Sequence, residues 1–506
     1  MSQSAVASSN PGVNPGRLFL GSCLALIATS VTFAVLGDIV GSLKSQFVLT
    51  NGDLGWIGGA SFWGFTVATF LLGPFCDALG MKKLIAFAFV CHAAGALMMI
   101  TATGFWTLFF GALIIAMGNG TVEAVCNPLV ATLYPTRKTV KLNQFHVWFP
   151  GGIVIGGLIC TGLTKMGIDS WQLRLGLILI PTVIYGFLFF GQQIPATERV
   201  QSGVSFGEMF QATFLRPLFL ILVFCMMITA SLELAPNRWI PDILKAGGID
   251  GTLILVWITG LMAVLRFFAG PVVHRISPTG ILLVSAVLSG VGLLWLSYAQ
   301  SGQVALLAAT VFALGVCYFW PTMLGVVSER VPKGGSLALG VMGGVGMLIT
   351  GVITLPLIGK IADGYLHQEL PVVETKAVLQ KSLIVLNEEK PKAKGKQSTD
   401  IQSAITSVEN VLAKATATSL PEPDTALALL AVKKETKAPV VAEIDKILNP
   451  ANNYGGRMAF RWLAPFAILL IIVFGSLWAR DLAAGGYRVE HIDDEMANAR
   501  RAPANA

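Results

Sequence analysis

Carboxyl and amide side chains recur four residues apart in two apolar stretches of this chain. Glu123 and Asn127 form the first pair, and Glu233 and Asn237 form the second. Residues four apart lie on one face of a helix. A carboxyl inside a long apolar segment is costly in lipid and is therefore a functional candidate. The alternatives are a structural hydrogen bond for Glu123 and an ion pair of Glu233 with nearby Arg238.

Neutral polar and aromatic residues accompany these acids. Asn127, Asn143 and His146 can donate and accept hydrogen bonds, which suits a hydroxyl-rich ligand. The alternative is that they join neighbouring helices by hydrogen bonds. Tyr318 and Trp320 offer flat faces on which a sugar ring can stack, but aromatic residues in apolar segments also serve packing. The residues alone leave both interpretations open for this set.

The elements that carry these residues are long apolar blocks. Hydrophobic residues make up 54% of the 506 residues and charged residues 12%, whereas soluble domains are about 25% charged. Blocks of about twenty apolar residues match a helix that crosses a bilayer, and the need to satisfy backbone hydrogen bonds in lipid favours helices. We therefore predict an all-α integral membrane protein with twelve transmembrane helices. The spans are expected at residues 18–40, 54–74, 84–103, 105–130, 143–164, 171–191, 217–240, 252–272, 280–299, 304–327, 337–361 and 458–478.

Basic residues predict the orientation of these helices. Lys and Arg gather in one set of short loops, whereas the alternate short loops hold little beyond Lys44, Lys165 and Lys245. Both termini are therefore expected to be cytoplasmic, in a multi-pass protein of the cell (cytoplasmic or inner) membrane. The first apolar block is too long for a signal peptide and is read as an uncleaved span. The net charge of +7 follows from these loops and does not indicate a nucleic-acid partner.

The spans divide into two similar sets of six. Pro74 and Pro271 follow a glycine at the ends of spans 2 and 8, and Pro128 and Pro321 lie in spans 4 and 10. These correspondences predict a duplicated six-helix unit, as in many transporters. The expected domains are a cytoplasmic tail (1–17), an N-terminal half (18–191), a cytoplasmic linker (192–216), helices 7–11 (217–363), an insert (364–456), helix 12 (457–480) and a cytoplasmic tail (481–506).

The insert at 364–456 interrupts the apolar pattern between helices 11 and 12. Residues 367–453 contain no Phe, Tyr or Trp, so a stable core of its own is not expected. Counting spans places the segment on the extracytoplasmic side, as a tolerated and partly disordered insertion in which runs such as 401–415 can form amphipathic helices. The alternative is a lid or a docking site for an unknown partner.

No motif of cofactor chemistry stands out. The chain has no Walker A sequence, no recognisable catalytic triad and no metal-ligand cluster. Its seven cysteines form no CxxC pair. We therefore expect no enzyme, no cofactor, no metal and no ATP-driven pump.

A glycine- and charge-bearing loop follows the second span. It reads Gly73-x-x-x-Asp77-x-x-Gly80-x-Lys82-Lys83. This loop resembles the signature of the major facilitator superfamily, with Met81 in place of the usual Arg. The resemblance implies two six-helix halves and a conformational gate, in which the glycine allows close packing and Asp77 pairs across the bundle. The alternative is a plain cytoplasmic turn.

Within that superfamily, the chain resembles the fucose–proton symporters. Glu123, Asn127 and the following proline match an E-x-x-x-N-P pattern, and Asn143 lies in a similar L-N stretch. Asp38 matches an acid of the first helix, with Gly37 where the family has Asn. The resemblance implies proton-coupling roles for Glu123 and Asp38. For Asp38 an exposed acid at a helix end is the alternative.

The expected function is proton-coupled symport of a neutral sugar or related polyol by alternating access. A carboxyl removed from water favours its uncharged form, so Glu123 is expected to carry a proton across as the halves rock. The substrate set is Asn127, Asn143, His146, Glu233, Asn237, Tyr318 and Trp320. The expected partners are the substrate, protons and the lipid bilayer, around a monomer. The alternatives are a sodium-coupled, nucleoside or drug transporter of the same fold, and a transport-inactive sensor or scaffold that uses the insert.

Overall fold

The computed structural model describes residues 12–47, 49, 51–422, 424–437 and 439–492. The described residues form helices and contain no strand. Eleven helices are long and apolar enough to cross a membrane, or twelve if one bent pair counts as a single span. The prediction of about twelve apolar helices is therefore confirmed.

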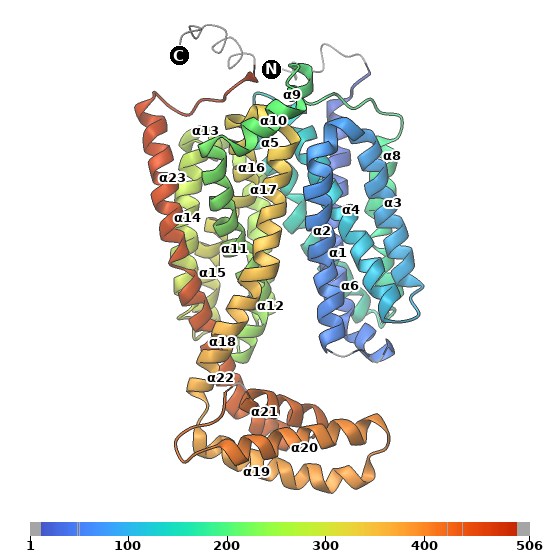
Figure 1. The fold of residues 1–506 in the computed structure, drawn as a ribbon, viewed down its shortest axis with the longest axis vertical. Coiled ribbons are helices and arrows are strands. Elements are labelled where there is room, and N and C mark those ends of the chain that lie inside the picture. The colour runs from blue at the N-terminus through green and yellow to red at the C-terminus, as the bar shows by residue number, and fades with distance from the viewer. Residues whose placement is uncertain (1–11, 48, 50, 423, 438, 493–506) are drawn as a thin grey trace.

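The N-terminal helices form one half of the bundle, which lies to the right in Figure 1. The predicted spans 5 and 6 each consist of two consecutive helices, α5 with α6 and α7 with α8. The bounds are α1 (Pro15–Phe47), α2 (Asn51–Leu79), α3 (Met81–Ile100), α4 (Phe105–Leu133), α5 (Lys138–His146), α6 (Trp148–Lys165), α7 (Trp171–Gly176) and α8 (Leu179–Phe189).

The second half stands beside the first (Figure 1). It carries five spans against six in the first half, or six if the bent pair counts as one span. Two short helices, α9 (Glu198–Gln201) and α10 (Phe206–Phe214), connect the halves at one end. The bounds of the second half are α11 (Pro217–Ala246), α12 (Gly251–Phe267), α13 (Ala269–Ile276), α14 (Pro278–Leu296), α15 (Gly302–Val316), α16 (Phe319–Arg330), α17 (Gly335–Ile349), α18 (Leu355–Glu369), α22 (Val440–Leu463) and α23 (Phe466–Ala483).

Two interruptions shape this second half. The helices α12 and α13 meet at 67°, because Pro271 has no backbone N–H to donate to the carbonyl of Phe267. Between α17 and α18 the backbone passes through a π-helical turn at Thr350–Thr354. Such turns are often found at functional sites.

The insert is a helical bundle, so the expectation of a segment without a core is wrong. Its helices are α19 (Val372–Glu389), α20 (Lys396–Lys414) and α21 (Asp424–Glu435), packed against the start of α22. Leu379, Val408, Leu429 and Ile444 are fully buried in a shared apolar cluster. Aliphatic side chains at helical spacing therefore close the core without aromatic residues. Figure 1 shows the insert at the end of the bundle opposite to α9 and α10.

Candidate functional site

Glu123 lies in the middle of α4 and is only 4% exposed. The amide Nδ2 of Asn127, one turn further on, donates to Glu123 Oε2 at 2.5 Å. His146 on α5 extends this chain, because its Nε2 lies 3.0 Å from Asn127 Oδ1 and 3.9 Å from Glu123 Oε2. The helical spacing predicted that Glu123 and Asn127 share a helix face, and the packing of α5 on α4 adds the imidazole of His146.

Arg266 on α12, in the second half, places a positive charge opposite Glu123 and His146. It is 1% exposed, and its Nη2 donates to Glu233 Oε1 on α11 at 2.8 Å. Its Nε and Nη1 donate to the carbonyls of Cys317 and His146, at 2.5 and 3.1 Å. The bond to His146 joins the two halves directly. The alternative pairing of Glu233 with Arg238 is wrong, because Arg238 is exposed and Arg266 takes its place.

A small cavity separates these groups. Its volume is about 30 Å³, close to the space of one water molecule and far below the roughly 300–1,000 Å³ of ligand pockets. The cavity in this structure is therefore smaller than a sugar needs, and the halves are in contact on its α9 and α10 side. The lining residues come from both halves and are Phe65, Glu123, His146, Phe149, Glu233, Leu234, Arg266, Trp320 and Met347.

The other predicted substrate residues are distributed around this cavity. Asn143 donates to Thr322 Oγ1 at 3.2 Å, across the interface of the halves. Trp320 lines the cavity, whereas the hydroxyl of Tyr318 donates to the carbonyl of Leu265 at 2.8 Å. Asn237 does not line it, and its buried Oδ1 finds no hydrogen-bond partner in the described part of the chain. The structure thus brings Glu123, Asn127, His146, Glu233 and Trp320 together.

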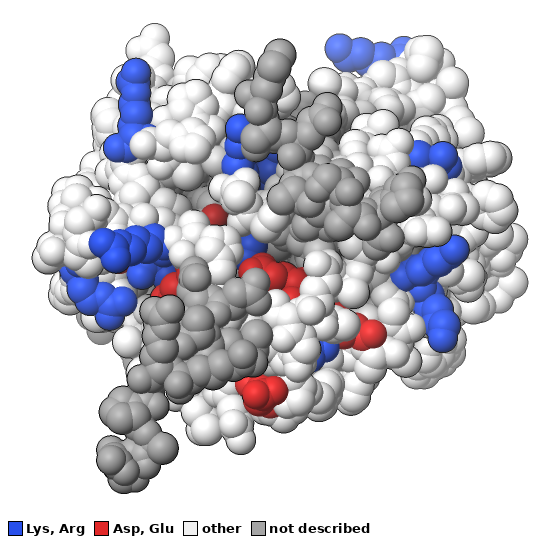
Figure 2. Space-filling model, turned by 90° about the horizontal axis from the view of Figure 1, so that it is seen from above, with Lys and Arg blue, Asp and Glu red and all other residues white. Residues whose placement is uncertain are grey.

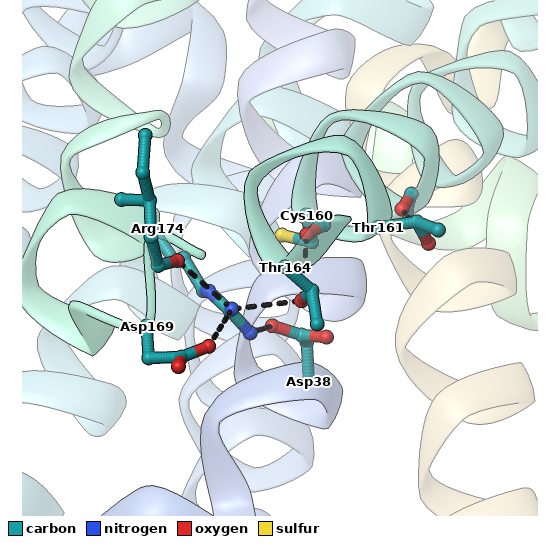
Figure 3. Close-up of polar contacts among 8 residues, drawn as sticks. Asp38, Cys160, Thr161, Thr164, Asp169 and Arg174 are labelled. Atoms are coloured by element: carbon teal, nitrogen blue, oxygen red, sulfur yellow. Dashed lines mark hydrogen bonds and ion pairs between the residues drawn. The ribbon is translucent and has the colours of Figure 1, made fainter. Parts of the chain in front are cut away.

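Asp38 belongs to a separate polar cluster, shown in Figure 3. Its Oδ2 lies 2.5 Å from Arg174 Nη1, and Arg174 Nη2 donates to Thr164 Oγ1 at 2.9 Å. Asp169 lies 3.5 Å from the same Nη2. The side chain of Asp38 is 30% exposed and does not line the central cavity. The structure therefore does not place Asp38 beside Glu123.

The predicted gate residues lie at the end of α2 and the start of α3, and only Gly73 among them touches the described part of the second half. A Cβ built on Gly73 would lie 3.1 Å from Gly340 Cα on α17, so the two helices touch through backbone. Asp77 accepts bonds from Arg199 Nε and Nη2 on α9, at 2.9 and 2.7 Å. Gly80 adopts φ +86° between α2 and α3, a conformation that favours glycine. Lys82 and Lys83, which follow, are exposed.

A second set of contacts at this end was missed by the sequence reasoning. Lys138 Nζ on α5 donates to the carbonyl of Ser328 at 3.1 Å and pairs with Glu198 at 2.6 Å. The backbone N–H of Thr139 donates to Glu329 Oε1 at 2.9 Å. The available signal was positional, because Lys138 and Glu329 lie near the corresponding ends of the repeated spans 4 and 10. These contacts hold the halves together between the cavity and the end that carries α9 and α10.

Comparisons of sequence place this fold among known transporters. The family model of the Major Facilitator Superfamily matches residues 18–362. The D-xylose transporter of Levilactobacillus brevis is 26% identical over 196 residues, which are 38% of this chain and 42% of that protein. Myo-inositol transporter 1 of Saccharomyces cerevisiae is 24% identical over 146 residues, which are 29% of this chain and 25% of that protein. Both matches thus span less than half of the relative's length.

Solved structures share the architecture. The transporter FucP in the outward conformation superimposes with a TM-score of 0.58 at 18% identity, over 68% of this chain and 92% of that chain. The proton:xylose symporter XylE bound to 6-bromo-6-deoxy-D-glucose gives 0.59 at 15% identity, over 70% and 90%. At such identities the likeness establishes the fold. The chain therefore belongs to the Major Facilitator Superfamily, and within it resembles the fucose–proton symporters.

Proposed function

We propose that this protein is a proton-coupled symporter that carries a neutral sugar or related polyol into the cell by alternating access. The observation that carries the proposal is a buried carboxyl, Glu123, at a cavity that both halves line. Sugar-transporter relatives support the substrate class. Both termini are then cytoplasmic, and the insert lies outside the cell membrane.

The charges around the cavity favour a neutral substrate. Arg266 and Glu233 compensate one another at 2.8 Å, so the pair presents little net charge to a ligand. Glu123 is held by the amide of Asn127 and faces His146 at 3.9 Å. Arg266 faces the same cavity but is paired with Glu233, so it compensates a second buried carboxylate only in part. Binding a proton removes the remaining cost of burying the Glu123 charge. Asn127 and His146 remain as the neutral groups suited to hydroxyls.

The transport cycle follows from the contacts that join the halves. Opening toward α9 and α10 requires α2 to leave α17 at Gly73, and Lys138 and Thr139 to leave α16. Opening toward the other side leaves these contacts in place. Glu123 takes up a proton together with the sugar on the outer side, and releases both after the halves rock.

Reconstituted vesicles test the coupling. We expect wild-type protein to accumulate a radiolabelled sugar from a panel of D-xylose, L-fucose and myo-inositol when the outside is acidified. Glu123→Gln should abolish this accumulation while sugar exchange at equal pH persists, because the cavity keeps its shape. The matched control is Glu369→Gln, an exposed acid at the end of α18. Unchanged acid-driven accumulation by Glu123→Gln would remove this residue from the mechanism.

The same vesicles separate the alternatives. A sodium gradient at constant pH drives uptake only if sodium is the coupling ion. Nucleosides and a cationic drug in place of the sugars test the other substrate classes. Absence of uptake and exchange for the whole panel would leave the sensor function, for which the folded insert is the specific observation.

A further inference from the structure

A crevice opens where the insert meets the second half, away from the central cavity. Its volume is about 450 Å³, within the range of small-molecule pockets. The α11 and α18 helices form one wall, and α21 and α22 form the other. The polar and aromatic lining residues are Trp239, Asp242, Lys245, Asp363, Lys433, Asp445, Asn449 and Asn452.

The walls of this crevice are held firmly together. Asn453 Nδ2 on α22 donates to the carbonyl of Ile243 on α11 at 2.8 Å. A Cβ built on Gly455 would lie 2.2 Å from the carbonyl oxygen of Ala362 on α18, so these two backbones are in direct contact. The α22 helix is thereby fixed to α11 and α18 at the base of the insert, and it continues from there into the insert core.

The lining offers unused polar groups. The indole Nε1 of Trp239 is covered from solvent, so this residue contributes its ring rather than its N–H to the crevice. Lys433 and Asp445 pair at 2.5 Å. The side chains of Asp242, Asp363, Asn449 and Asn452 make no hydrogen bond or ion pair with any described residue. Acceptors and donors thus face the same space, beside an aromatic ring.

We propose that this crevice binds an uncharged, hydroxyl-rich molecule such as a mono- or disaccharide. Hydroxyls both donate and accept, which matches carboxylates beside amides and an ammonium group. The Trp239 ring supplies an apolar face for a sugar ring. Three Asp and two Lys line the crevice, a nearly balanced set that does not select a polyanion. The insert is then a ligand-binding module, and this holds whether or not the central cavity transports a proton.

Binding to the full-length protein in lipid nanodiscs tests the proposal. Calorimetric titration with D-xylose, L-fucose, myo-inositol and maltose should reveal binding that Asn449→Ala/Asn452→Ala weakens at least tenfold. Trp239→Ala removes the ring face and should also weaken binding. The matched control is Asn387→Ala, an amide on α19 that donates to Leu383 within its own helix and should change nothing. Thermal melting confirms that each variant is folded.

Asn127→Ala separates this crevice from the central site. This variant should bind sugar in the crevice as the wild type does. If it no longer transports sugar, that defect lies in the central site and not in the crevice. If Asn127→Ala loses all binding while Asn449→Ala/Asn452→Ala binds as the wild type does, the ligand belongs to the central cavity and the inference is overturned. The inference is overturned as well if the wild-type protein binds none of the four sugars at about 10 mM, ten times the ligand concentration that corresponds to a Kd of about 1 mM.

Discussion

Arg266 is among the largest fully buried side chains of the protein, and its three contacts connect both halves. It pairs with Glu233 and donates to the backbone at Cys317 and His146. Removing one member of a buried pair leaves an uncompensated charge, whereas replacing both is often nearly neutral. The pair therefore holds Arg266 in place for its bond to the His146 carbonyl of the other half more than it adds to stability.

Substitution of this pair should show that asymmetry. Arg266→Met alone should lower the free energy of unfolding by about 3–5 kcal/mol, measured by denaturant titration in detergent. Arg266→Met/Glu233→Gln should recover most of that loss but not sugar exchange, because the bond to the His146 carbonyl is gone. If the double variant is as unstable as the single one, charge compensation is not what the pair contributes.

At the scale of elements, the approach of α2 and α17 determines whether the end near α9 and α10 can close. A Cβ built on Gly340 would lie 3.0 Å from Gly73 Cα and 3.1 Å from the Thr69 carbonyl oxygen. Backbone cannot withdraw from such a contact as a flexible side chain can. A larger residue here is therefore expected to separate the halves.

Gly340→Val should shift the protein toward the state open at this end. We expect faster amide hydrogen exchange in residues 136–143 and 325–333, which carry the contacts of Lys138 and Glu329. The control is Gly157→Val on α6, where no atom lies within 4 Å of the added Cβ. Equal exchange in the two variants would show that the glycine contact does not control closure.

The insert core offers a second prediction at this scale. Leu429 is fully buried and its neighbour Leu430 is 49% exposed. Leu429→Ala should cost the insert about 2–5 kcal/mol, and trypsin should then cleave at the lysines of 376–446 faster. Leu430→Ala is the matched control and should leave the cleavage rate unchanged. Similar rates for both variants would mean that the buried cluster does not hold the insert together.

At the scale of the whole molecule, the two ends of the bundle differ in charge and in shape. Figure 2, which looks onto the end that carries α9 and α10, shows Lys and Arg side chains around its rim. Exposed cations at the helix ends include Lys82, Lys83, Arg137 and Arg275. The positive-inside rule predicts that this end faces the cytoplasm. The insert projects from the opposite end.

Labelling of intact cells checks this orientation. All seven native cysteines are buried, so background reaction with a membrane-impermeant maleimide should be low. Asn387→Cys in the insert should react in intact cells, whereas Lys82→Cys should react only after permeabilisation. The reverse pattern would place the insert in the cytoplasm and contradict the expected topology.

The sequence by itself determined the features that depend on local periodicity. Continuous apolar blocks specify the membrane helices, because lipid leaves the backbone no other partner. The four-residue spacing placed Asn127 and Glu123 on one helix face, where they are in contact. The gate glycines and Asp77 were found through the same short-range motif, although their part in gating stays a prediction.

Only the tertiary structure decided which distant residues meet. Arg266 rather than Arg238 faces Glu233, and Asp38 pairs with Arg174 instead of approaching the cavity. Sequence separation carries no information about these partners, because they depend on how helices rotate and pack against one another. The core of the insert likewise depends on the tertiary structure. Each of its helices has an apolar face, and these faces are buried only when α19, α20, α21 and α22 pack together.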